Sequence, residues 1–286
     1  MNILVTGCNG QLGNEIQLLE KCCDNHFFFN TDVNELDITD ADAINAFVDA
    51  NQIDGIINCA AYTAVDKAES NEALCHKLNA TAPGYLAAAV GKREGWMVQV
   101  STDYVFDGTK HTPYIETDPT CPDSVYGRTK LEGERLVREH CERAMIVRTA
   151  WLYSTFGNNF VKTMLRLGKE KTQLGVIFDQ IGTPTYARDL ATAILTAVDS
   201  GIVPGIYHFS NEGVTSWYDF TKAIHRIAGI SSCRVNPLHT EEYPTPARRP
   251  HYSVLDKTKI KKTYKIEVPH WEESLEECIS KLKEQQ

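Results

Sequence analysis

The chain has none of the cysteine spacings that hold a metal or form a redox pair. Its nine cysteines include no C-x-x-C, and only Cys22-Cys23 are adjacent, which in 286 residues indicates reduced thiols rather than a disulfide framework. No secretory signal precedes the first strand-like run, and no apolar run is long enough to span a membrane. We therefore expect a cytoplasmic protein without a membrane partner.

Positive charge is also scarce. There are 29 Lys and Arg against 38 Asp and Glu, a formal net charge of −9. This balance argues against nucleic acid as a partner, although a local basic cluster can still bind a small anion. The hydrophobic fraction of 42% and charged fraction of 23% are typical of a globular enzyme, and the length suits one large domain or one and a half.

A glycine-rich turn follows the first apolar run. Residues 2–6 read NILVT, a strand pattern, and residues 7–13 read GCNGQLG. Glycines there allow a tight turn and close approach of backbone N–H groups to phosphate, and a helix over about 11–20 would point its N-terminus at a pyrophosphate. The spacing is G-x-x-G-x-x-G rather than G-x-G-x-x-G. Its position predicts a dinucleotide site; a plain loop is the alternative.

Acidic residues follow the second predicted strand, residues 26–30. Asp32 lies nineteen residues past Gly13, where an acid typically bonds the ribose of NAD, and it would repel a 2′-phosphate. This favours NADH mildly; the alternative is that Asp32 caps a turn. Asp37 and Ile38 belong to a predicted short strand and are expected beside the adenine.

The remaining chain alternates short β-branched strands with amphipathic helices. This predicts an α/β fold, a Rossmann-type doubly wound parallel sheet with a smaller C-terminal α/β substrate lobe. We assign residues 1–150 to the dinucleotide-binding domain, with parts of the later chain packing back on it, and 151–286 mainly to the substrate lobe. Expected strands are 55–58, 96–100, 145–149, 175–178 and 205–209; expected helices are 40–51, 64–91, 158–169, 187–198, 216–228 and 271–283.

Tyr126 and Lys130 lie four residues apart on a further predicted helix, which Asp123 or Ser124 could cap. A nearby ammonium would lower the phenol's pKa from its usual value of about 10, making the hydroxyl a proton donor near neutral pH. A surface pair without function is the alternative.

Hydroxyls end the 96–100 strand. Ser101 and Thr102 are therefore expected at the carboxyl edge of the sheet, where open α/β folds bind ligands. With the phenol and the ammonium they indicate carbonyl chemistry, although a plain strand end is the alternative.

Two later features have open interpretations. Trp151, just past the 145–149 strand, belongs either to the core or to a cleft, where its ring would stack on a base or sugar. Arg248 and Arg249 lie in a proline-stiffened loop and either bind a diphosphate or face solvent.

Seven sequence blocks spread over essentially the full length carry a family resemblance: NILVTGCNGQLG, NCAAYTAVDKAE, STDYVFDG, YGRTKLEGE, RTAWLY, GNNFVKTMLRL and PTPARRP. With these blocks the chain resembles the extended short-chain dehydrogenase/reductases, and within them the dTDP-4-dehydrorhamnose reductase family. The resemblance implies reduction of a dTDP-sugar substrate, dTDP-4-dehydro-β-L-rhamnose, to dTDP-β-L-rhamnose by hydride from NADPH or NADH.

The resemblance also implies roles for single residues. Tyr126 would protonate the C4 oxygen, Lys130 would lower the pKa of Tyr126 and bind the nicotinamide ribose, and Thr102 would hold the keto oxygen. Asp103 would contact the sugar and Trp151 would pack against it. The residues implied to hold the cofactor are Gly7, Gly10, Gln11, Leu12, Gly13, Ala61, Tyr62 and Thr63, with Tyr62 where the family often has histidine.

The sequence departs from the family at one position. Some members dimerise around a divalent metal held by carboxylates, but here Glu15 would be joined by Arg188, which does not share a site with a cation. We therefore expect no metal, and a monomer or weak homodimer.

Two other functions remain open. The architecture also serves nucleotide-sugar epimerases and dehydratases, although Thr102-Asp103 lacks the following glutamate that a dehydratase needs. A related non-catalytic protein is a regulatory subunit of methionine adenosyltransferase, although the reactive residues are intact here.

Overall fold

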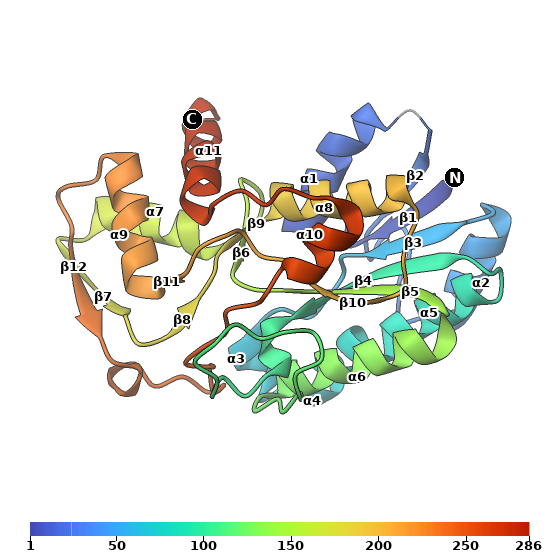
Figure 1. Ribbon diagram of the computed structural model, residues 1–286, viewed down its shortest axis with the longest axis horizontal. Coiled ribbons are helices and arrows are strands. Elements are labelled where there is room, and N and C mark those ends of the chain that lie inside the picture. Colours follow the sequence, from blue (N-terminus) through green and yellow to red (C-terminus); the bar gives the residue numbers. More distant parts are fainter. Residues whose placement is uncertain (24, 286) are drawn as a thin grey trace.

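The computed structural model describes residues 1–23 and 25–285, and a six-stranded parallel sheet forms its larger part (Figure 1). The strand order is β10-β5-β4-β3-β1-β2. β1 pairs with β2 on one side and with β3 on the other, so the chain reverses direction across the sheet beside β1, where α/β folds bind ligands. The strands are β1 (Asn2–Thr6), β2 (Phe27–Thr31), β3 (Gly55–Asn58), β4 (Trp96–Thr102), β5 (Arg143–Thr149) and β10 (Gly205–His208).

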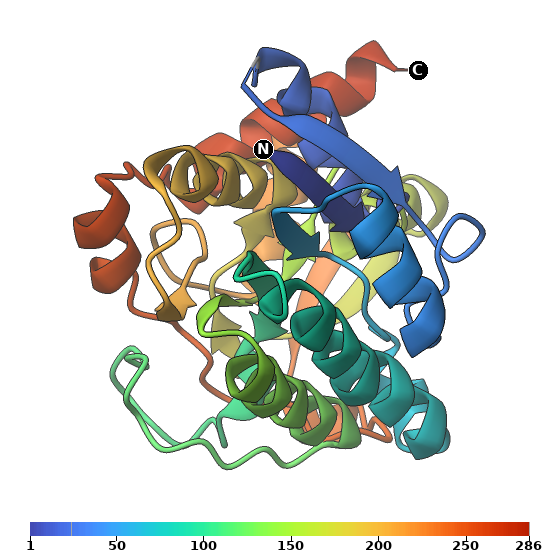
Figure 2. The ribbon, with the colours of Figure 1, turned by 90° about the vertical axis from the view of Figure 1, so that its right-hand side faces the viewer.

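Helices cover both faces of this sheet, as Figure 2 shows. On one face α1 (Gln11–Leu19) and α8 (Ala187–Ser200) pack against side chains such as Val5 and Val98. On the other, α2 (Ala41–Ala50), α5 (Ala82–Gly91) and α6 (Val125–His140) cover Leu4 and Met97. Strands buried on both faces account for their continuous apolar sequence.

A smaller lobe lies beside the carboxyl edge of the sheet (left in Figure 1). Its core lies among three helices and a parallel strand pair, β7 and β12. Two short pairings, β6 with β9 and β8 with β11, connect it to the rest. The elements are β6 (Leu152–Tyr153), α7 (Phe160–Glu170), β7 (Gln173–Ile177), β8 (Ile181–Gly182), β9 (Thr185–Tyr186), β11 (Thr215–Ser216), α9 (Trp217–Ala228), β12 (Arg234–Leu238) and α11 (Trp271–Glu284).

The C-terminal half does not belong to the smaller lobe alone. β10 extends the large sheet beside β5, and α8 and α10 (Thr258–Tyr264) contribute side chains to the core of the sheet. β10, α8 and α10 therefore pack with the large sheet, although they come from the later part of the chain.

Two predicted elements differ from the structure. The helix predicted over 64–91 is divided into α3 (Val65–Ala68), α4 (Glu72–His76), the π-helical segment η2 (Lys77–Thr81) and α5. Residues 36–38 form a turn instead of a strand: the Thr39 N–H and hydroxyl both donate to the Asp37 carboxylate, while Leu36 and Ile38 pack into the core. The apolar–polar–apolar order of residues 36–38 therefore comes from a turn in which Leu36 and Ile38 point inward, and not from a strand.

The described cysteines and helices bear on two further expectations. Seven described cysteines are free thiols that take part in no disulfide bond, as predicted: Cys8, Cys59, Cys75, Cys121, Cys141, Cys233 and Cys278. The side chain of Cys22 lies outside the described part. No helix within residues 1–23 and 25–285 is long and apolar enough to cross a membrane.

Candidate active site

A cavity of about 770 Å³ lies where the carboxyl edge of the sheet meets the smaller lobe. Its size is that of a small-molecule or cofactor site. Residues far apart in the sequence line it, from the glycine-rich turn, the ends of β4 and β5, α6 and the first residue of α9. The predicted residues among them are Gly7, Gly10, Gln11, Leu12, Gly13, Asp32, Asp37, Ile38, Ala61, Thr63, Thr102, Asp103, Tyr126, Lys130 and Trp151.

The glycine-rich turn packs tightly against neighbouring backbone only because Gly7 and Gly13 lack side chains. Gly7 has φ +66°, and a Cβ there would lie 2.7 Å from the Cα of Ala60. A Cβ on Gly13 would lie 2.5 Å from the carbonyl oxygen of Gly7. Because α1 begins directly after Gly10, its free N–H groups point into the turn. The cradle fits a pyrophosphate.

Acidic residues line the far side of this cradle. The Asp32 carboxylate accepts from the N–H groups of Val33 (2.8 Å) and Asn9 (3.2 Å), which fixes its orientation. Hydrogen bonds from Thr39 hold the pKa of Asp37 below its usual value. Among the described residues that line the cavity, the only cationic side chain is Lys130, so no arginine or lysine faces Asp32.

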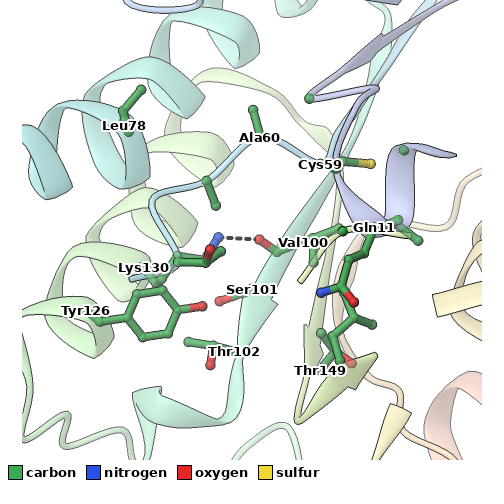
Figure 3. A pocket seen from close by; sticks show the side chains of 18 of the residues that line it. Gln11, Cys59, Ala60, Leu78, Val100, Ser101, Thr102, Tyr126, Lys130 and Thr149 are labelled. Carbon is green, nitrogen blue, oxygen red and sulfur yellow. Dashed lines mark hydrogen bonds between the residues drawn. The ribbon is translucent and has the colours of Figure 1, made fainter. Parts of the chain in front are cut away.

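Hydroxyl, phenol and ammonium converge at the opposite end of the cavity. Figure 3 shows the Tyr126 hydroxyl directed toward Ser101 and Thr102, with Lys130 behind it. The ammonium of Lys130 donates to the carbonyl oxygen of Val100 at 2.6 Å. The ring of Tyr104 packs edge-on against Tyr126, with centroids 5.5 Å apart. The Ser124 hydroxyl accepts from the Gly127 N–H, so Ser124 rather than Asp123 caps the N-terminus of α6.

The pKa of Tyr126 corrects one prediction. Burial raises this pKa above its usual value, and a hydrogen bond with Thr102 opposes the rise. Lys130 instead engages the β4 backbone, and burial lowers its own pKa to about 8. Tyr126 is therefore a neutral phenol at physiological pH, which is the protonated form that a proton donor needs.

A buried ion pair between Glu134 and Arg148 acts electrostatically on Lys130. Glu134, one helical turn after Lys130, accepts from Arg148 at 2.9 and 2.7 Å and from the Ser101 hydroxyl at 2.5 Å. The Glu134 and Arg148 side chains are 3% and 2% exposed. The Glu134 carboxylate raises the pKa of Lys130 against the effect of burial. The sequence analysis did not single out this pair, whose members lie on different elements.

Thr102 and Asp103 form a second polar pair. The Thr102 hydroxyl donates to Asp103 Oδ1 at 2.9 Å and accepts from the Tyr104 N–H at 3.2 Å. Burial raises the pKa of Asp103 to about 6, while the hydroxyls of Ser253 and Thr102 favour its charged form. Asp103 Oδ2 is buried and lacks a hydrogen-bond partner of normal geometry.

The smaller lobe supplies the remaining wall. Trp151 lines the cavity and its ring stacks on Trp217 at a centroid distance of 3.5 Å. Asn159 donates to Gln11 at 3.0 Å, joining the lobe to the glycine-rich turn. Of the two interpretations of Trp151, the structure supports the cleft. The sequence analysis missed Trp217 and Asn159, since no local pattern distinguishes them from core or cap residues.

Three predicted ligand-binding residues lie outside the cavity lining. The Tyr62 backbone is held by Asn79, while its ring packs near Val125. Arg249 pairs with Asp66 at 2.8 Å, and the largely exposed Arg248 pairs with Asp123 at 3.1 Å. Both guanidiniums are already neutralised by carboxylates, and a role at the diphosphate stays a prediction.

Glu15 is a buried residue of α1 and lies near an arginine. Its carboxylate accepts from Ser154 at 2.7 Å and lies 3.8 Å from the Arg188 guanidinium. Within the described residues there is no group of three or more His, Cys, Asp or Glu side chains that could hold a metal ion.

The parallel sheet, the glycine cradle and the Thr–Tyr–Lys cluster define a nicotinamide-dependent oxidoreductase of the extended short-chain dehydrogenase/reductase type. The model of the RmlD substrate binding domain matches residues 1–284. The chain belongs to the dTDP-4-dehydrorhamnose reductase family.

Relatives and solved structures support this assignment. The chain is 42% identical to the dTDP-4-dehydrorhamnose reductase of Aggregatibacter actinomycetemcomitans, with 96% of each chain covered. It is similar to the structure of such a reductase from Clostridium acetobutylicum, with TM-score 0.95, 47% identity, and 99% and 100% of the two chains covered. The reductase from Bacillus anthracis, solved in complex with NADP, gives TM-score 0.93 and 38% identity over 98% and 99%. These names favour a reductase over an epimerase, a dehydratase or a regulatory subunit.

Proposed function

We propose that this chain reduces the C4 keto group of dTDP-4-dehydro-β-L-rhamnose to give dTDP-β-L-rhamnose. The observation that carries the proposal is the convergence of Thr102, Tyr126 and Lys130 at one end of a cavity whose other end is a glycine cradle. The substrate class follows from the names of relatives that match over the full chain.

The cofactor is NADPH or NADH. Its pyrophosphate would lie against Gly7, Gly10 and Gly13, and its adenosine ribose beside Asp32. The bound reduced nicotinamide supplies hydride to the substrate carbon. A carboxylate beside the ribose and the lack of a facing cation among the described lining residues make NADH an acceptable donor.

The chain's own residues would donate the proton to the C4 oxygen and stabilise the negative charge that this leaves on Tyr126. Tyr126, a neutral phenol, would give its proton to the C4 oxygen as hydride arrives at C4, leaving an alcohol and a phenolate. Lys130 would stabilise that phenolate and bind the nicotinamide ribose. Thr102 would hold the keto oxygen, and Asp103, which lines the cavity, would contact the sugar.

The smaller lobe would bind the sugar nucleotide. Trp151 would pack against the sugar ring, across the cavity from the cofactor cradle. Because Arg188 lies beside Glu15, we infer that no divalent metal bridges two chains there and that the protein is a monomer or weak homodimer. Neither a nucleic acid nor a membrane is an expected partner of this acidic chain.

The test follows the absorbance of reduced nicotinamide with dTDP-4-dehydro-β-L-rhamnose generated in situ. The wild type should oxidise one NADPH or NADH for each sugar reduced. Tyr126→Phe should lower kcat by a factor of about 10² to 10⁴ while still binding cofactor. Tyr85→Phe is the matched control, because Tyr85 is 38% exposed on α5 and does not line the cavity. A wild-type protein that binds cofactor but does not turn over this sugar contradicts the proposal.

A further inference from the structure

Trp151 has a backbone conformation that aromatic residues rarely adopt. Its φ is +48°, in the left-handed region, although it is neither a glycine nor an asparagine. It lies between β5 and β6, two residues past Thr149, which is paired in register with Thr102. Strain of this kind persists only where neighbouring contacts impose it, and it is concentrated at functional sites.

The contacts that impose it come from the smaller lobe. The indole of Trp151 is stacked on that of Trp217 with an interplanar angle of 11° and a centroid distance of 3.5 Å. Gly182 leaves space on the Trp151 ring edge, since a Cβ there would lie 2.7 Å from the indole. The carbonyl oxygen of Trp151 accepts from the Thr185 N–H at 3.2 Å.

Trp217 is itself held in place. It is the first residue of α9, whose cap Ser216 accepts from the Asp219 N–H at 3.0 Å. The ring of Phe160, from α7, packs against it with centroids 4.6 Å apart. The stack therefore fixes a residue of the sheet edge against two helices of the lobe.

We propose that Trp217 is a positioning residue for the sugar nucleotide, because it holds the indole of Trp151 against the part of the cavity that contains Tyr126 and Thr102. The inference rests on the proposed function, which places a sugar ring there. A flat indole of fixed orientation offers a hydrophobic face to the C–H side of a pyranose, and sets which face of the ring lies toward the proton donor. A freely turning indole would lose this control.

The experiment is a double-mutant cycle with Trp217→Leu, Trp151→Ala and both together, read as KM and kcat for the 4-keto sugar. Trp217→Leu should raise KM for the sugar about threefold to tenfold, the worth of one aromatic pair, with KM for NADH unchanged. Because Trp217 acts through Trp151, it should add little in the Trp151→Ala background. Trp217→Phe, which keeps an aromatic ring, should restore most of the affinity. The proposal is overturned if Trp217→Leu raises KM equally in the wild-type and Trp151→Ala backgrounds, or if Trp217→Leu leaves KM unchanged.

Two measurements separate this inference from simple loss of structure and from failure of the proposed function. Stacked indoles give a coupled near-ultraviolet circular dichroism signal, which should vanish in either single variant and persist in Trp271→Phe. Trp271 is the matched control, being an indole of the same lobe outside the cavity lining. Calorimetric binding of dTDP-β-L-rhamnose repeats the cycle without turnover: if the wild type binds this sugar but does not form it, the reductase proposal fails and the cycle still decides the role of Trp217. A wild type without the coupled signal, or without affinity for the sugar, contradicts the inference.

Discussion

Breaking the buried pair of Glu134 and Arg148 should destabilise the fold far more than any surface ion pair does. Arg148→Met keeps the apolar stem but removes both guanidinium contacts, leaving a 3% exposed carboxylate with only the Ser101 hydroxyl as partner. Loss of one member of a buried pair costs about 3–5 kcal/mol. Against a total stability of about 5–15 kcal/mol, this is a large fraction.

Urea unfolding followed by far-ultraviolet circular dichroism measures the loss. The urea midpoint should fall while the slope of the unfolding free energy against urea concentration stays nearly constant, and Tm should fall by about 5–8 °C. The double variant Glu134→Gln/Arg148→Met should cost less than the sum of the two single variants, since it leaves no unpaired buried charge. Arg135→Met is the matched control: its pair with Glu132 on the same helix is 61% and 38% exposed and should be worth less than about 1 kcal/mol.

A cost below about 1 kcal/mol, or additive single variants, would refute the reasoning.

Three further outcomes are expected. Since burial lowers the pKa of Lys130 to about 8, and since the charged ammonium acts, kcat/KM should fall as pH rises above about 8; a fall beginning only above about 9.5 would point to another group. Asp32→Ala removes a charge beside the ribose and should raise the NADPH-to-NADH ratio of kcat/KM about fivefold; an unchanged ratio means the carboxylate lies too far away. Treatment with EDTA should leave kcat and the sedimentation coefficient unchanged, because Arg188 faces Glu15; activity restored by magnesium would contradict this.

Local sequence patterns predicted the parts of the site that depend on one element. The 7–13 turn depends only on a strand end and the Tyr126–Lys130 pair only on one helical turn, and residues of both segments line the cavity. The pattern at 36–38 misled, because a turn with two inward apolar side chains has the same alternation as a strand.

Contacts between distant segments could not be predicted in this way. Trp217 meets Trp151 only through the tertiary fold, and nothing local in the sequence marks the stack. The pKa of Tyr126 depends on how deeply the fold buries it, a quantity that residue spacing does not contain.

The insertion of β10 into the large sheet affects how the chain can be divided. A truncation after residue 150 would remove β10, leaving β5, a seven-residue strand of mostly buried side chains, as an open sheet edge. It would also remove α8 from one face of the sheet and uncover side chains of the same core, such as Leu12 and Ile16 of α1. An uncovered apolar edge of this kind pairs with other chains. The nucleotide-binding half is therefore expected to aggregate when expressed alone, and exchange of substrate lobes between relatives requires grafting of the smaller lobe around β10 and α8 rather than one cut.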